Sequence, residues 1–213
     1  MRNTRIAIAT AITVFLTACH NLPSTDNGAD SIRLASDNEV QGSIDSAAAM
    51  KSWMEFKTPG NMHKMLAKSS GQWKEAITMW EKPGAPPQKT TSTCVNTMIL
   101  DGRYQQSTHK GNVMGMPFEG ISTVGYDNIL KEFVMNWIDN MGTGFMQMAG
   151  PYDSLAQVIH FKGTMTDPAS RKVTDVREDF KFMPDGSQLL EMYASPIPNK
   201  PEFKTMEIKL TKR

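Results

Sequence analysis

Few side chains in this sequence could carry covalent chemistry. Cys94 lies in a β-like run over residues 90–95, and His63, His109 and His160 are the histidines beyond residue 50. A nucleophilic site needs an activated Ser or Cys beside a base, but there is no G-x-S-x-G motif and no base close to Cys94 in sequence. We therefore interpret Cys94 as a small buried hydrophobe and place His109 and His160 at exposed or turn-adjacent strand positions. No H-E-x-x-H, C-x-x-C or phosphate-binding loop is present, so we predict no cofactor. The sequence favours a protein that is not an enzyme, and an enzyme whose catalytic residues are dispersed along the chain is the alternative.

Charged side chains that share a strand face with apolar ones are candidates for polar contacts inside the fold. Glu178 alternates with apolar residues over 176–182, which predicts that its carboxylate points inward. Arg103 follows a turn, and Arg177 is the chain neighbour of Glu178. A buried charge is costly unless it is paired, so these three residues are predicted to bind the polar end of a ligand. The alternative is that they form structural ion pairs across neighbouring strands, together with Glu191.

Methionine and aromatic residues are candidates for an apolar wall. Met146 and Met148 are two residues apart, so both thioethers share one strand face. Such spacing suits Cu(I), but no His or Cys clusters beside them in sequence, and methionine is a pliable filler of apolar pockets. We therefore place Met146 and Met148, with Trp137 and Tyr193, in the wall of a ligand site and predict no metal.

Composition and charge narrow the class of protein. The 213 residues carry 23 Lys and Arg against 22 Asp and Glu, a formal charge of +1. This balance argues against nucleic-acid binding, which needs a basic surface. Two cysteines are too few for a disulfide framework. The length predicts one domain with a sizeable core, and nothing in the composition identifies a protein partner.

The N-terminus has the features of an export signal. Residues 1–18 begin with a basic segment and continue with an apolar run over 6–17, which is long enough for a signal peptide and too short to span a bilayer. The run ends in Leu-Thr-Ala-Cys19, which resembles the lipobox of bacterial lipoproteins. The resemblance implies cleavage before Cys19 and fatty acyl chains, such as palmitate, on that residue, which would anchor the protein in a membrane. His20 stands where Asp would retain a lipoprotein in the inner membrane, so the outer membrane of the cell envelope is favoured. An ordinary secretory signal with an incidental cysteine is the alternative.

The remaining chain divides into a tether and a domain. Residues 19–50 are rich in Ser, Asp, Asn, Gly and Ala and lack a sustained apolar period, which predicts a disordered tether. Residues 51–213 form the predicted domain. It opens with a short helix for which Thr58 is the predicted N-cap and Pro59 the first helical residue.

Turn signals divide the rest of the domain into runs of about ten residues. Short connections of this kind join antiparallel neighbours, and many strands in sequence order must curl or close. We predict an all-β fold: a closed or nearly closed antiparallel up-and-down β-barrel with the short helix as a lid. The ten predicted strands cover residues 72–81, 88–100, 103–110, 117–126, 130–138, 143–152, 157–166, 171–183, 187–195 and 202–212.

Two resemblances support this barrel. Gly71-Gln72-Trp73 at the head of the first strand resembles the G-x-W entry of lipocalins. Several segments between about residue 50 and residue 213 resemble a bacterial family known as domain of unknown function family 1579, which implies a lipocalin-like barrel and brings no catalytic residues. The segments are 83–87 (PGAPP), 100–104 (LDGRY), 115–120 (GMPFEG), 125–128 (GYDN), 137–144 (WIDNMGTG), 191–193 (EMY) and 206–208 (MEI).

These observations leave three functional hypotheses. The first is a lipid-anchored envelope protein whose barrel binds a small, mainly apolar ligand. The second is a structural or partner-binding module whose barrel is filled by its own side chains. The third is an enzyme with a dispersed site or a methionine-based copper binder.

Overall fold

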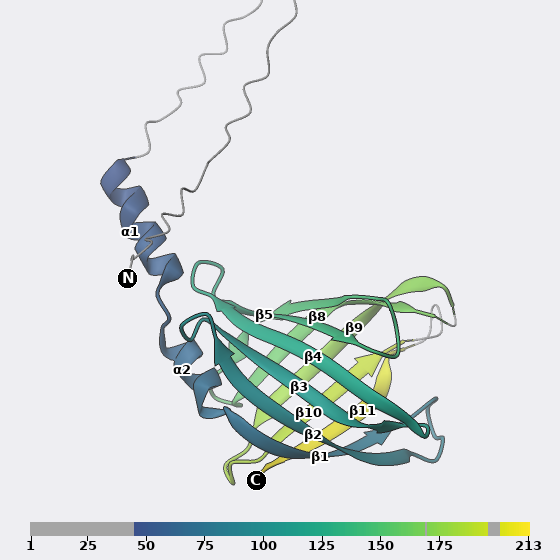
Figure 1. The fold of residues 1–213 in the computed structure, drawn as a ribbon. Helices are drawn as coiled ribbons and strands as arrows, with labels where there is room; N and C mark the ends of the chain where they lie inside the picture. The colour runs from purple at the N-terminus through teal and green to yellow at the C-terminus, as the bar shows by residue number, and fades with distance from the viewer. Residues whose placement is uncertain (1–44, 169, 196–200) are drawn as a thin grey trace, which may run out of the picture. The chain divides into compact units, whose positions relative to one another are not determined.

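The computed structural model describes residues 45–168, 170–195 and 201–213 (Figure 1). The predicted signal peptide, Cys19 and the tether up to residue 44 lie outside these residues. Within the described part of the chain, no helix is both long and apolar enough to cross a membrane.

The domain is a closed antiparallel β-barrel. Its sheet has the strand order β6-β5-β4-β3-β2-β1-β11-β10-β9-β8-β7, and a further pairing of β6 with β8 completes a ring of ten strands. The first strand, β1, pairs with the last, β11, so sequence neighbours pair all round the ring as predicted. The strands are β1 Gly71–Met79, β2 Gln88–Ile99, β3 Tyr104–Val113, β4 Met116–Asp127, β5 Glu132–Asp139, β6 Met146–Gly150, β7 Tyr152–Asp153, β8 Val158–Asp167, β9 Lys172–Phe182, β10 Gln188–Ala194 and β11 Phe203–Lys212.

Two glycines allow β6 and β8 to approach where the ring closes. A Cβ atom at Gly150 would lie 1.8 Å from the backbone oxygen of His160, and one at Gly163 would lie 2.0 Å from that of Gln147. Any other residue at either position would therefore push the two strands apart. The sheet can therefore close only because both residues are glycines, which have no side chain.

One predicted turn is wrong. The third predicted strand ends at residue 110 because Gly111-Asn112 is a turn signal in the sequence, but these two residues belong to the β3–β4 ladder. The hairpin turns at Met114 and Gly115, whose φ angles are 53° and 83°. Positive φ at both central residues is the geometry of a two-residue hairpin that matches the twist of its strands, and this geometry extends both strands beyond the predicted ends.

Two helices precede the barrel. α1 spans Ser46–Lys57 and so begins inside the segment predicted to be a disordered tether; Asp45 caps it by accepting from the Ala47 N–H at 3.0 Å. α2 spans Asn61–Lys68, with Gly60 as its N-cap. The predicted cap, Thr58, instead donates its hydroxyl to the Met54 carbonyl at the end of α1, at 2.6 Å.

α2 closes one end of the barrel, as the lid prediction required (Figure 1). Its buried Leu66 packs into the main core cluster. Side-chain amides inside the barrel also donate to backbone carbonyls at the C-terminal end of α2. Gln105 Nε2 donates to the Leu66 carbonyl at 2.6 Å, and Asn96 Nδ2 donates to the Ser69 carbonyl at 3.1 Å. Trp73, which is 2% exposed, donates its indole N–H to the same Ser69 carbonyl at 2.8 Å. The lid is thus attached by both apolar packing and buried hydrogen bonds.

Candidate functional site

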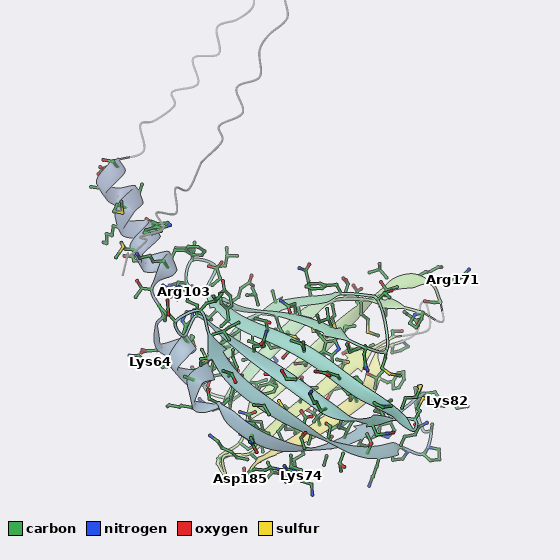
Figure 2. All side chains as sticks on the ribbon, in the orientation of Figure 1. Lys64, Lys74, Lys82, Arg103, Arg171 and Asp185 are labelled. Atoms are coloured by element: carbon green, nitrogen blue, oxygen red, sulfur yellow. The ribbon has the colours of Figure 1, made fainter. Side chains whose placement is uncertain are left out.

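The barrel contains a cavity of about 490 Å³. Its wall consists mainly of the inward-facing residues of the strands, and Leu66 and Ser69 of the α2 segment line its closed end. At the opposite end the lining includes the solvent-exposed Met141 and Phe145. In Figure 2, the labelled residues Lys64 and Arg103 lie at the α2 end of the barrel, and Lys82 and Arg171 lie at the opposite end. The cavity therefore extends from the lid towards the loop that joins β5 to β6.

The cavity has two chemically different walls. Strands β1 to β4 contribute a mainly polar wall, which also includes the apolar Ile77, Met79, Val113, Phe118 and Val124, and the strands from β5 to β11 contribute a mainly apolar one. The polar wall contains Glu75, Ser92, Cys94, Asn96, Gln105, Ser107, His109 and Ser122. The apolar wall contains Met135, Trp137, Met146, Ile159, Phe161, Met165, Phe180, Phe182, Leu190, Met192, Met206, Ile208 and Leu210.

Three residues of the polar wall form a hydrogen-bonded chain. His109 Nδ1 lies 2.9 Å from Glu75 Oε1, and His109 Nε2 lies 3.8 Å from Cys94 Sγ. The hydroxyl of Ser92 donates to the other oxygen of Glu75. Strand register produces this arrangement, because Glu75 is paired with Ser92 and Cys94 is paired with His109 on adjacent strands.

This environment keeps the Cys94 thiol protonated. Burial raises the pKa of Cys94 to about 12, the charge of Glu75 adds to the rise, and a hydrogen bond from Ser107 opposes it. Cys94 is 1% exposed, as predicted for a buried small residue. No base lies close to Cys94 in sequence, and the base that contacts it, His109, is 15 residues away. The exposed or turn-adjacent position predicted for His109 is wrong, because its side chain is 14% exposed and lines the cavity. Their contact depends on the register between β2 and β3.

Glu178 is an isolated carboxyl group in the apolar wall. It is 4% exposed, lines the cavity and lies opposite Phe161 and Met192 on the neighbouring strands. Burial, and secondarily the charge of Asp179, raises the pKa of Glu178 to about 8. No hydrogen bond or ion pair joins it to any other residue in the described ranges. The sequence prediction that Glu178 points inward is confirmed.

Trp137 and Met146 line the cavity, as predicted. The Trp137 indole donates to Asp139 Oδ2 at 2.7 Å, and its ring lies edge-on to His109 with 5.0 Å between the centroids. The ring occupies space left by Gly120, where a Cβ atom would lie 2.5 Å from it. Met148 is buried in the adjoining core cluster and does not line the cavity.

The structure places the other predicted site residues outside the cavity. Arg177 lies on the outer face of β9, because it is adjacent to the inward-facing Glu178 and successive side chains alternate. It pairs with Asp179 at 2.6 Å and Glu202 at 2.8 Å, and its guanidinium stacks 3.8 Å from the Tyr193 ring centroid. The assignment of Arg177 and Tyr193 to an interior ligand site is therefore wrong.

Arg103 is also outside the site. It lies in the β2–β3 turn, donates to the Leu100 carbonyl at 3.1 Å and lies 3.6 Å from Asp101. The alternative of structural ion pairs across neighbouring strands is confirmed for Glu191, which lies between Lys181 and Lys204. Arg177 forms structural ion pairs too, but with Asp179 of its own strand and with Glu202. The alternative is wrong for Glu178, because the cations nearest in sequence all point outward.

The charge of the cavity lining has one sign. Among the described residues that line it, the ionisable groups other than His109 and Cys94 are the carboxyl groups of Glu75, Asp139 and Glu178, and none is Lys or Arg. The lining therefore disfavours a ligand with a negative charge. It is compatible with a neutral ligand or one that carries a cationic group.

Sequence comparison gives the family. The profile of a family described as protein of unknown function (DUF1579) matches residues 58–212, which is nearly the whole domain. The chain belongs to the DUF1579 family. The solved structure of Rv2717c from M. tuberculosis is similar to this DUF1579 protein with a TM-score of 0.53 and 11% sequence identity, over 73% of this chain and 99% of that one. At that identity the similarity concerns the fold alone. Among curated proteins, none is significantly similar in sequence.

Proposed function

We propose that this DUF1579 protein is a lipid-anchored cell-envelope protein that holds a small, mainly apolar ligand inside its barrel. The observation that carries the proposal is the cavity of about 490 Å³ with an apolar wall, which is in the size range of small-molecule sites. A barrel filled by its own side chains, the structural alternative, would not leave such a space.

Glu178 supports a specific polar contact within this apolar site. An isolated buried carboxyl group is costly, and a ligand donor or cationic group placed against it would offset that cost. Because the described lining lacks Lys and Arg, we expect neutral or cationic amphiphiles to bind better than fatty acids of the same length. Mass spectrometry of small molecules released from protein purified out of native envelopes tests the proposal. Recovery of one compound in stoichiometric amount would support it, and a barrel that is empty under native conditions and binds no amphiphile would contradict it.

The anchoring half of the proposal rests on the lipobox at Cys19. Cys19→Ser should move the protein from the membrane pellet to the soluble fraction without changing its thermal unfolding, because the barrel begins about fifty residues later and no described contact requires the lipid. Fractionation of cells that express either form measures this. A Cys19→Ser protein that stays in the membrane after a high-salt wash would show that lipidation is not the anchor.

A further inference from the structure

The chain Glu75–His109–Cys94 has the order of a proton relay. The carboxylate contacts the Nδ1 side of the imidazole, and the sulfur lies on the Nε2 side. A carboxylate can only accept, so Nδ1 donates to Glu75 and the Nε2 lone pair faces the sulfur. At rest the thiol donates to Asn96 Oδ1 at 2.9 Å, so its hydrogen turns from Asn96 to Nε2 when the proton is transferred. A nucleophile, a base and a group that orients the base are the three parts of an activated thiol site.

This arrangement suits a relay better than a metal chelate. A Cys, His and Glu set can hold a metal, and the ligand atoms of these residues lie within 4.8 Å of one another. However, both Glu75 oxygens are already engaged, one with His109 Nδ1 and the other with the Ser92 hydroxyl, and the thiol donates to Asn96 Oδ1. An ion bound by all three residues would have to displace these hydrogen bonds.

The relay opens onto the proposed ligand space. Cys94 and His109 both line the cavity, opposite the apolar wall. The Ser107 side chain acts on the sulfur by lowering the pKa of Cys94, and Ser107 also lines the cavity. A carbonyl group on a ligand held by the apolar wall would therefore meet a thiol, a base and a hydroxyl donor on the polar wall.

We propose that Cys94 is a nucleophile that accepts the acyl group of a neutral ester bound in the cavity, which is an activity beyond ligand storage and rests on the proposed binding. The sulfur forms a bond to the carbonyl carbon while the thiol proton passes to His109 Nε2. The carbon–oxygen bond then breaks and His109 protonates the departing alcohol. Water, deprotonated by His109, hydrolyses the thioester and restores the thiol. Cys94 and His109 act as catalytic residues, and Glu75 acts as a positioning residue that holds the imidazole.

The resting protonation of the thiol agrees with this role. A thiol whose pKa lies near 12 is not a free thiolate, so its reaction requires a base at the moment of attack. The site should therefore react with a carbonyl compound that binds beside His109 and should be slow with a small alkylating agent such as iodoacetamide.

Acylation of the full-length protein by 4-nitrophenyl butyrate tests the proposal. We expect a burst of nitrophenol equal to the amount of protein, and peptide mapping should place one butyryl group on Cys94. Cys94→Ala and Cys94→Ser should abolish the burst, which separates loss of the thiol from any effect of a cavity in the core. His109→Gln should slow acylation by roughly 10²- to 10⁴-fold, the usual range for a general base.

Two further variants separate chemistry from structure. Glu75→Gln should lower the acylation rate at saturating ester and leave the concentration for half-maximal rate unchanged, because Glu75 orients the base and does not contact the ester. His160→Gln is the matched control: His160 Nδ1 lies 2.7 Å from Asp179 Oδ1 on the outside of the barrel, a similar pair without a thiol. It should react at the wild-type rate.

Three results would overturn the proposal. One is acylation no faster than in Cys94→Ala; another is an unchanged rate in His109→Gln. The third is stoichiometric binding of Zn²⁺ that requires Cys94 in a protein that is not acylated, which would assign the cluster to a metal. If butyrate ester changes the fluorescence of Trp137 without acylating Cys94, the nucleophile is disproved while ligand binding stands. If it does neither, both proposals fail for this class of compound.

Discussion

At the scale of single residues, burial couples the protonation of Glu178 to folding. Its pKa is raised from an ordinary value of 4.5 to about 8 in the barrel, so between these values the folded protein holds a proton that the unfolded chain releases. The stability contributed by the neutral carboxyl is fully present below about pH 4.5 and is lost as the pH rises through about 8. The wild type should therefore lose up to a few kcal/mol of unfolding free energy between pH 5 and pH 8, and Glu178→Gln should remove this loss. Urea unfolding of both proteins at the two pH values measures the difference.

Glu191 is the control, because its pKa is shifted in the opposite direction to that of Glu178. Hydrogen bonds from Lys181, and further contacts with Lys204, lower the pKa of Glu191. Its contribution is present above the unfolded pKa and is lost as the pH falls through the lower folded pKa. Glu191→Gln should leave the stability loss between pH 5 and pH 8 intact. If both variants behave like the wild type in this window, the buried position of Glu178 is wrong.

Trp73 is predicted to contribute more to stability than the other tryptophans. It is 2% exposed and bonds the lid through Ser69, so Trp73→Ala should cost about 3–5 kcal/mol by urea unfolding. Trp53→Ala, in the exposed helix α1, should change stability by no more than about 0.5 kcal/mol. Equal effects of the two substitutions would contradict the described packing of the lid.

The residues of the candidate site were predictable to different degrees. Glu178 was found because apolar residues flank it on the same strand face. The same alternation excludes Arg177 from the interior, and the prediction failed by treating sequence neighbours as spatial partners. The contact between Glu75 and His109 spans 34 residues. It depends on the pairing of three strands, which no local pattern specifies.

At the scale of secondary structure, the closure of β6 against β8 is the most sensitive feature. Gly163→Ala places a Cβ atom 2.0 Å from the Gln147 carbonyl oxygen, a backbone atom that cannot move without breaking the ladder. We expect a loss of at least about 3 kcal/mol, above the usual cost of overpacking, measured by urea unfolding. Gly144→Ala is the control, because nothing lies within 4 Å of the Cβ position there.

The strands were more predictable than the helices. Turn residues such as Asp101 and Gly102, both with positive φ, mark strand ends in sequence and in structure. The β3–β4 hairpin was misplaced because Gly111-Asn112 is also a turn signal. Here Gly111 instead provides room for Ser92, whose Cβ would lie 2.8 Å from an added one. α1 was missed because its apolar residues with helical spacing, Met50, Trp53 and Met54, cover only about one turn, which is too short a pattern to identify a helix.

At the scale of the whole molecule, the barrel is predictable from sequence and the asymmetry of its interior is not. Ten short strands in sequence order predict a meander that closes, and the structure confirms it. The usual pattern of apolar residues inside and polar residues outside gives no reason to place the alternating Ser92, Cys94 and Asn96 in the interior. Several of these polar groups face inward because they form hydrogen bonds with the lid or with one another. These contacts depend on the pairing of strands that are distant in sequence, so they cannot be predicted from a local pattern.

The central claim, that a small ligand occupies the barrel, is tested most directly by the fluorescence of a protein in which Trp137 is the sole tryptophan. Replacing the other three tryptophans with Phe gives this protein, and a second one that retains only Trp73 is its control. Decanol, decylamine and decanoate are probes that share a chain and differ in head-group charge. We predict that decanol and decylamine change Trp137 emission with saturation, that decanoate does so only at higher concentration, and that Trp73 does not respond. A Trp137 that is insensitive to all three probes in a folded protein would contradict the claim.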